Sequence, residues 1–98
     1  MIDGVYAVQL DTALGRKPAV VELRTEGDVV HVALDAPVIG KVTTVASLCG
    51  NTFTCEGNLK VRLLGKVDYR LTGEVTGDGI TCHLDSNKGQ LDLAGTRV

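Results

Sequence analysis

Apolar and polar residues alternate along most of this 98-residue chain. Alternation with a two-residue period is typical of strands that bury one face, and the spacing of an amphipathic helix is nearly absent. Gly-containing pairs such as Gly27-Asp28 and Gly50-Asn51 interrupt the pattern with residues that tolerate positive φ in tight turns. The pattern therefore predicts eight strands, near residues 2–11, 18–26, 29–36, 41–48, 52–63, 66–76, 79–86 and 90–97.

These predicted strands follow one another through turns of a few residues, which favours an antiparallel up-and-down order. Pro18 and Pro37 fall at predicted strand ends, where a missing N–H does little harm. Eight strands with one apolar face form either a two-sheet sandwich or a closed barrel. Closure removes the edge strands, so we expect one all-β domain, residues 1–98, built as an eight-stranded antiparallel barrel.

The two halves of the chain match when one is shifted by 50 positions. Gly27-Asp28 then falls on Gly77-Asp78, Leu34-Asp35 falls on Leu84-Asp85, and Leu14-Gly15 falls on Leu64-Gly65. The matches lie at turns and at core-facing positions, as expected for a repeated unit. We predict that residues 1–49 and 50–98 are two copies of one four-strand unit.

The composition excludes several classes of partner. Ten basic and twelve acidic residues give a net charge of −2, and no basic run is longer than Arg16-Lys17. Nucleic-acid binding needs a basic stripe and exposed aromatic side chains, and aromatic residues make up only 3% of this chain. No apolar stretch approaches the ~20 residues of a membrane-spanning helix. We expect neither nucleic acid nor a membrane as partner.

Three cysteines, Cys49, Cys55 and Cys82, bear on the cellular compartment. An odd number at irregular spacing does not form a disulfide framework, so reduced thiols in the cytoplasm are the simplest interpretation. The first predicted strand begins beside Met1, so we expect no signal peptide within this sequence, and a leader that has been removed is the alternative. A Cys49–Cys55 bridge is the alternative for an exported protein.

Polar side chains inside the predicted barrel are the best candidates for a site. The two-residue period points the following residues inward: Tyr6, Thr44, Cys55, Tyr69, Cys82 and Arg97. A buried arginine needs a partner. Tyr6 and Arg97 therefore either close one end of the barrel or, with the other inward groups, mark the polar end of a ligand cavity.

The two ends of the chain carry the motifs Gly4-Val5-Tyr6 and Gly95-Thr96-Arg97. They resemble those of the calycins, a group that includes lipocalins and avidins, which open with Gly-x-Trp and place an Arg near the end of the last strand. The resemblance implies that Arg97 packs across the Tyr6 ring and that a small apolar molecule is held inside the barrel. Tyr here replaces the Trp. The chain also resembles short bacterial β-domains of uncharacterised function.

The outer faces of the two halves differ in character. The first half places apolar residues outside at Val5, Ala7, Val20, Ala33 and Val45. The second half places mainly charged and polar residues outside, at Thr54, Glu56, Lys60, Arg62, Asp68, Arg70, Glu74 and His83. A monomer gains nothing from an exposed apolar face, so we expect the five apolar residues to form a homodimer contact.

Catalytic and metal-binding patterns are weak in this sequence. His83 and Asp85 share the outer face of one strand with no Ser or Cys placed beside them, and His31 also points outward. Cys82 and His83 are adjacent and so lie on opposite faces, which argues against a shared metal ion. Gly77-Asp78-Gly79 lacks the Lys-Ser/Thr and helix of a phosphate loop, so we interpret it as a hairpin turn. We expect no cofactor.

Three functions remain from the sequence. The first is a non-enzymatic barrel that binds a small, mostly apolar molecule inside. The second is a structural or protein-interaction module that acts through its outer face as a homodimer. The third is an enzyme that uses the inward Tyr, Cys and Arg groups, and we rank it last.

Overall fold

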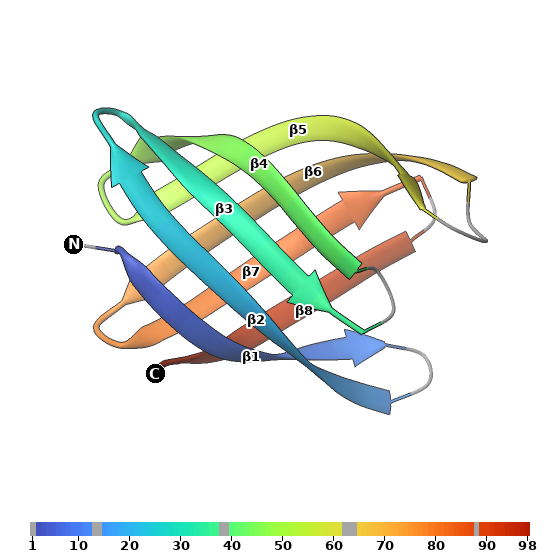
Figure 1. Cartoon of the computed structure of the whole chain (residues 1–98), viewed down its shortest axis with the longest axis horizontal. Coiled ribbons are helices and arrows are strands. Elements are labelled where there is room, and N and C mark those ends of the chain that lie inside the picture. Colours follow the sequence, from blue (N-terminus) through green and yellow to red (C-terminus); the bar gives the residue numbers. More distant parts are fainter. Residues whose placement is uncertain (1, 13–14, 38–39, 62–64, 88) are drawn as a thin grey trace.

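The computed structural model describes residues 2–12, 15–37, 40–61, 65–87 and 89–98. They form a closed barrel of eight antiparallel strands in sequence order, which confirms the predicted all-β up-and-down fold (Figure 1). The strands are β1 (Gly4–Thr12), β2 (Gly15–Glu26), β3 (Val29–Ala36), β4 (Gly40–Cys49), β5 (Thr52–Val61), β6 (Gly65–Thr76), β7 (Gly79–Ser86) and β8 (Gly89–Arg97). The last two residues of the strand predicted at 52–63 lie outside the described residues.

The barrel has two distinct ends. Both chain termini lie at one end, on the left in Figure 1, together with the two-residue turns at Gly27-Asp28, Gly50-Asn51 and Gly77-Asp78. The turn glycines have φ of 60–65°, a conformation that glycine adopts at no steric cost. We call this the terminal end and the opposite one the far end.

The core follows the predicted alternation of inward and outward residues. Tyr6 and Val30 have no exposed surface, and Leu23 and Ile80 are 2% exposed, all toward the terminal end. Their strand neighbours one position away point to solvent. Within the described residues, no helix has the length and apolarity needed to cross a membrane.

Pro18 was expected at a strand end, and that prediction is wrong. β2 begins three residues earlier, at Gly15, and Pro18 pairs with Gln9 of β1. The described pairs between β2 and β3 begin only at Val20 and Asp35. Pro18 therefore has a strand neighbour on one side only, where the lack of an N–H is tolerated as it is on an edge strand.

The two halves of the chain meet at two seams. Among the described residues, β1 and β8 are joined by six pairs, from Tyr6–Arg97 to Asp11–Asp92. β4 and β5, which are linked by the Gly50-Asn51 turn, are joined by only three, and these end at Ser47–Thr54. Beyond that point β4 and β5 diverge toward the far end (Figure 1).

The two middle strands of each half have bounds that differ by the predicted shift of 50 residues. β6 begins and ends 50 positions after β2, and β7 begins and ends 50 positions after β3. The repeat itself stays a prediction, since matching bounds alone do not establish a common unit. Leu14 and Leu64, which we aligned above, lie outside the described residues.

Candidate functional site

Tyr6 and Arg97 form a closed hydrogen-bonded group at the terminal end of the barrel. The Tyr6 hydroxyl donates to the main-chain oxygen of Ile2 at 2.7 Å and accepts from Nη2 of Arg97 at 2.8 Å. The guanidinium carbon lies 5.3 Å from the centre of the Tyr6 ring, within range of a cation–π contact. Arg97 thus lies against the Tyr6 ring, as the resemblance to calycins implied.

Two further residues complete this group. Nη1 of Arg97 lies 3.5 Å from a carboxylate oxygen of Asp78, in the turn between β6 and β7. Gly4 has a φ of 150°, and a side chain there would meet Nε of Arg97 at 3.0 Å. The hydrogen bond to Tyr6, helped by nearby carboxylates, raises the pKa of Arg97 above its ordinary value. The geometry favours closure of the barrel over ligand contact for Tyr6, whose surface is fully buried.

A second group of inward side chains remains partly open to solvent. Its members come from β3, β4, β6, β7 and β8 and lie in the half of the barrel nearer the far end: Leu34, Val42, Thr44, Tyr69, Leu71, Leu84 and Leu91. We call them the open interior cluster. Several of them pack against the buried core with their other side. On the β1–β3 side of the same end, Leu10, Ala19 and Ala36 are buried, so the accessible inner wall belongs mainly to β4 and β6–β8.

Within this cluster, the Tyr69 ring packs against a glycine of the neighbouring strand. It pairs with Gly57 of β5, and its ring lies so close that a side chain at Gly57 would meet the Tyr69 hydroxyl at 2.9 Å. Glycine on one strand therefore makes room for an aromatic ring from the next. Tyr69 is half-buried and brings a hydroxyl group to an otherwise aliphatic wall.

Thr44 and Cys55 face each other across the short β4–β5 seam. The Thr44 hydroxyl lies 4.0 Å from the Cys55 sulfur and donates to it. Burial raises the pKa of Cys55, although this hydrogen bond opposes the shift. Cys82, deeper in the core, has its pKa raised to about 12 by burial. Both thiols are therefore protonated at neutral pH and behave as small core groups.

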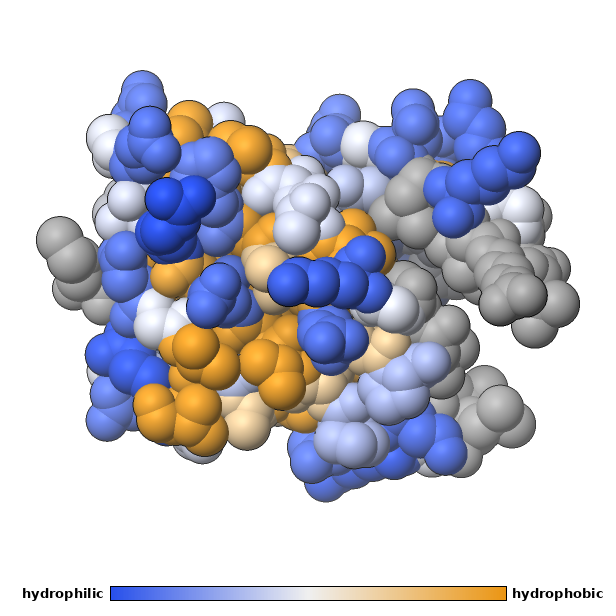
Figure 2. Space-filling view, in the orientation of Figure 1, coloured by the Kyte–Doolittle hydropathy of each residue, from blue (hydrophilic) through white to orange (hydrophobic). Residues whose placement is uncertain are grey.

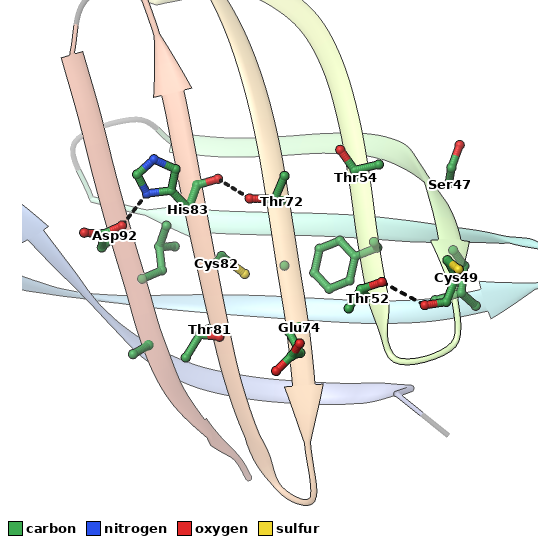
Figure 3. Close-up of a pocket in the computed structure, with 15 residues that line it drawn as sticks. Ser47, Cys49, Thr52, Thr54, Thr72, Glu74, Thr81, Cys82, His83 and Asp92 are labelled. Carbon is green, nitrogen blue, oxygen red and sulfur yellow. Dashed lines mark hydrogen bonds and ion pairs between the residues drawn. The ribbon is translucent and has the colours of Figure 1, made fainter.

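The outer surface of β4–β8 carries a shallow groove of about 650 Å³ (Figure 3). One row of paired residues crosses it from strand to strand: Ser47, Thr54, Thr72, His83 and Asp92. A second row runs beside it: Cys49, Thr52, Glu74, Thr81 and Ala94. Half of the labelled side chains carry a hydroxyl group, and the chain's aromatic residues lie elsewhere or point inward from this face.

His83 is the only imidazole in this groove among the described residues, and both of its ring nitrogens are occupied. Nδ1 lies 2.5 Å from Asp92 and Nε2 lies 3.2 Å from Asp85. The hydrogen bond to Asp92 contributes most to raising the pKa of His83, and Asp85 adds to it. The Thr72 hydroxyl donates to the main-chain oxygen of His83, not to its ring (Figure 3). A His–Thr nucleophile pair is therefore not assembled.

The described residues contain no group of three or more His, Cys, Asp or Glu side chains arranged to hold a metal ion. His31 lies on the outer face beside Glu26, at 3.2 Å. The cysteines described in the structure are free thiols, with Cys49 exposed and the other two buried. The Cys49–Cys55 bridge considered for an exported protein is not formed here.

The predicted interface residues lie on the outer face of β1–β4. Val5, Val20 and Val45 are 36%, 45% and 52% exposed, and Ala7 pairs with Val20. Figure 2 shows apolar surface gathered on this face with charged side chains lying across it. Glu22, for example, lies between Val5 and Ala33 in one row of pairs. The face is an apolar patch crossed by charges.

Sequence reasoning missed three features of these sites. It paired His83 with Asp85 alone, although Asp92 pairs with His83 on the outer face of the next strand. It overlooked Asp3, whose carboxylate accepts from the main-chain N–H and hydroxyl of Thr25, which lowers the pKa of Asp3. It also missed the short β4–β5 seam, for which the poor strand formers Gly57 and Asn58 were the available signal.

Comparison with known proteins assigns no family to the chain. No protein-family model matches it, and no curated protein or solved structure shows significant similarity to it.

Proposed function

We propose that this protein is a non-enzymatic barrel that binds a small, mostly apolar molecule against the open interior cluster. One observation carries the proposal. Five inward aliphatic side chains of β3, β4 and β6–β8 toward the far end stay half-buried, although Leu10, Ala19, Ala36 and Val67 at the same end are buried, whereas Leu23, Val30 and Ile80 toward the terminal end are almost fully buried. Apolar surface left in contact with water gains about 25 cal/mol per Å² when a ligand covers it.

The chemistry of the cluster supports an apolar ligand with one polar group. Leu34, Val42, Leu71, Leu84 and Leu91 supply aliphatic contacts. Hydroxyl groups come from Thr44 and Tyr69, on opposite sides of the β4–β5 seam. Ligand sites typically combine an apolar lining with a few placed polar groups.

The reactive groups support binding rather than catalysis. The ring nitrogens of His83 are held by two carboxylates, and the pKa of Cys82 is raised to about 12. A general base or nucleophile needs a free lone pair near neutral pH. Within the described part of the chain, neither residue offers one.

The proposal is tested by titrating 1-octanol into labelled protein and following amide shifts by NMR. We expect saturable shifts at residues 34, 42, 71, 84 and 91. Leu84→Trp fills the inner wall and should weaken binding at least about tenfold, equivalent to 1.4 kcal/mol. Val20→Trp, on the outer face, is the control and should bind as the parent does. Shifts absent at millimolar octanol, or equal loss in both variants, would contradict the proposal.

A second candidate function is an interaction module that meets a second copy through the outer face of β1–β4. The exposed valines Val5, Val20 and Val45 favour it. The face also carries charges of both signs, among them Glu22 and Asp35 as well as Arg24 and Lys41, as a face that meets itself requires. Val20→Glu would turn such a dimer into a monomer in sedimentation equilibrium. An unchanged mass would remove this candidate.

A further inference from the structure

Among the described residues, β4 and β5 form no residue pair beyond Ser47–Thr54, so main-chain groups on this side of each strand have no strand partner. Cys49 and Thr52 flank a two-residue turn, so they form a hydrogen-bonded pair and Ser47–Thr54 forms the next. Leu48, between them, donates its N–H to Asp28 on the β3 side. By this alternation the main-chain groups of Lys41, Thr43 and Val45 point into the seam.

No described residue pairs with this stretch of β4 on the seam side. The β4–β5 pairs stop at Ser47–Thr54, whereas β4 pairs with β3 from Ser47 to Gly40. Lys41 and Thr43 are exposed, and Val45 is 52% exposed. β4 therefore presents a free strand edge of about five residues inside an otherwise closed barrel.

The two strand edges at the seam, β4 and β5, differ in how readily their residues pair with another strand. Residues 41–45 read Lys-Val-Thr-Thr-Val, and four of the five are β-branched. The facing residues 56–60 read Glu-Gly-Asn-Leu-Lys, with charges, a glycine and an asparagine but no β-branched residue. Natural edges are protected by charge and by poor strand formers, so β5 is a protected edge and β4 is not.

We propose that the free edge of β4 pairs with the same edge of a second copy of this chain. The two β4 strands run antiparallel about a two-fold axis at Thr43. Thr43 then faces the partner's Thr43, and Lys41 faces the partner's Val45. These are the residues whose main-chain groups point into the seam, so three hydrogen-bonded pairs form and no strand has to slip.

Side chains at this pairing are compatible. Each Lys41 lies opposite a valine and four residues away from the partner's Lys41, so like charges do not face each other. The aliphatic stem of Lys41 covers the exposed Val45 across the pair. Thr43 against Thr43 is a favourable cross-strand pair. The charge pattern therefore admits a second copy, whereas a strand with Lys or Arg opposite Lys41 would be repelled.

Cross-linking tests the register directly. In a Cys49→Ser background, Thr43→Cys places two thiols in one hydrogen-bonded pair, with Cα atoms about 5.5 Å apart, inside disulfide range. Val45→Cys is the matched control, because the two copies of residue 45 lie about 14 Å apart. Under mild oxidation we expect dimer from Thr43→Cys at least tenfold faster than from Val45→Cys. Equal rates, or no dimer from either, would overturn the proposal.

Proline substitution tests the edge in solution. Thr43→Pro removes an N–H that β3 does not use, and Asn58→Pro does the same on the protected edge of β5. Sedimentation equilibrium should show a dimer dissociation constant raised at least tenfold by Thr43→Pro and unchanged by Asn58→Pro. A parent that stays monomeric at millimolar concentration overturns the proposal, as does a dimer broken by Val20→Glu alone. Amide NMR spectra confirm that each variant is folded, and octanol titration reports separately on the interior site.

Discussion

The two halves of this barrel meet twice, and the two seams are built differently. β1 and β8 are far apart in sequence, yet six pairs join them in the described part of the chain, and Arg97 contacts Tyr6 across them. β4 and β5 are neighbours joined by a tight turn, yet share three. Proximity in the chain therefore does not decide how well a seam closes.

Specific side chains at the β1–β8 seam distinguish it from the β4–β5 seam. Gly95 lets β1 approach so closely that a side chain there would lie 2.0 Å from the main-chain oxygen of Ala7. Tyr6 and Arg97 add a buried ring and a hydrogen bond across the same seam. At the other seam the described side-chain hydrogen bonds are a 2.8 Å bond from the Thr52 hydroxyl to the main-chain oxygen of Cys49, beside the turn, and the weak one from Thr44 to Cys55. Closure thus depends on a few specific side chains.

The largest test of the comparison removes the ring that closes the β1–β8 seam. Tyr6→Ala should lower the free energy of unfolding by ~3–5 kcal/mol, as a buried aromatic deletion does. Tyr69→Ala is the control, because Tyr69 is only half-buried and should cost clearly less. Urea denaturation followed by circular dichroism measures both. Equal losses would mean that the buried Tyr6 ring at the β1–β8 seam contributes no more to stability than the half-buried Tyr69 ring.

A smaller effect is expected from the glycine that permits the close approach of β1. Gly95→Ala forces the β1 backbone to move and should cost about 1–3 kcal/mol, the range for overpacking. Gly57→Ala is the matched change near the other seam, where the Cβ meets only the tip of the Tyr69 side chain. We expect it to cost less than Gly95→Ala in the same urea experiment. The reverse order would count against the importance of the β1–β8 approach.

Amide hydrogen exchange tests the open seam without changing a residue. In dilute protein the amides of Lys41, Thr43 and Val45 should exchange at least about tenfold faster than those of Val42 and Thr44, which bond to β3. No such alternation is expected in β1, which has partners on both sides. Uniform protection along β4 in the monomer would show that its edge is covered.

The smallest effect concerns His83, which ties β8 to β7. Its folded pKa is raised, so its stabilising contribution is full below the unfolded pKa near 6.5 and is lost as pH rises through the folded pKa. His83→Gln should therefore lower the melting temperature more at about pH 6 than at about pH 9. Asp92→Asn should show the same pH dependence. A difference that grows with pH would contradict the assigned hydrogen bonds.

Much of this architecture could be predicted from local pattern. The two-residue alternation and the glycine turns gave the strand order, and parity placed Tyr6 and Arg97 on the same side of adjacent strands. Parity cannot give the number of pairs in a seam, because that depends on how the whole barrel twists. The β4–β5 gap and the half-buried state of Leu71 and Leu84 follow from that global geometry. The Asp92 partner of His83 needed the register of β7 and β8 as well.

A main-chain hydrogen bond near the C-terminus joins the two ends of the chain. The N–H of Val98 donates to the main-chain oxygen of Val5 at 2.8 Å, and the termini lie together at the terminal end (Figure 1). A short linker could connect them, and the chain could be reopened at the Gly50-Asn51 turn. In such a circular permutant the linker would join β8 and β1 as a hairpin. β4 and β5 would no longer be joined by a turn. Its stability would show how much of the pairing of β4 with β5 depends on the Gly50-Asn51 turn and how much depends on the side chains of the two strands.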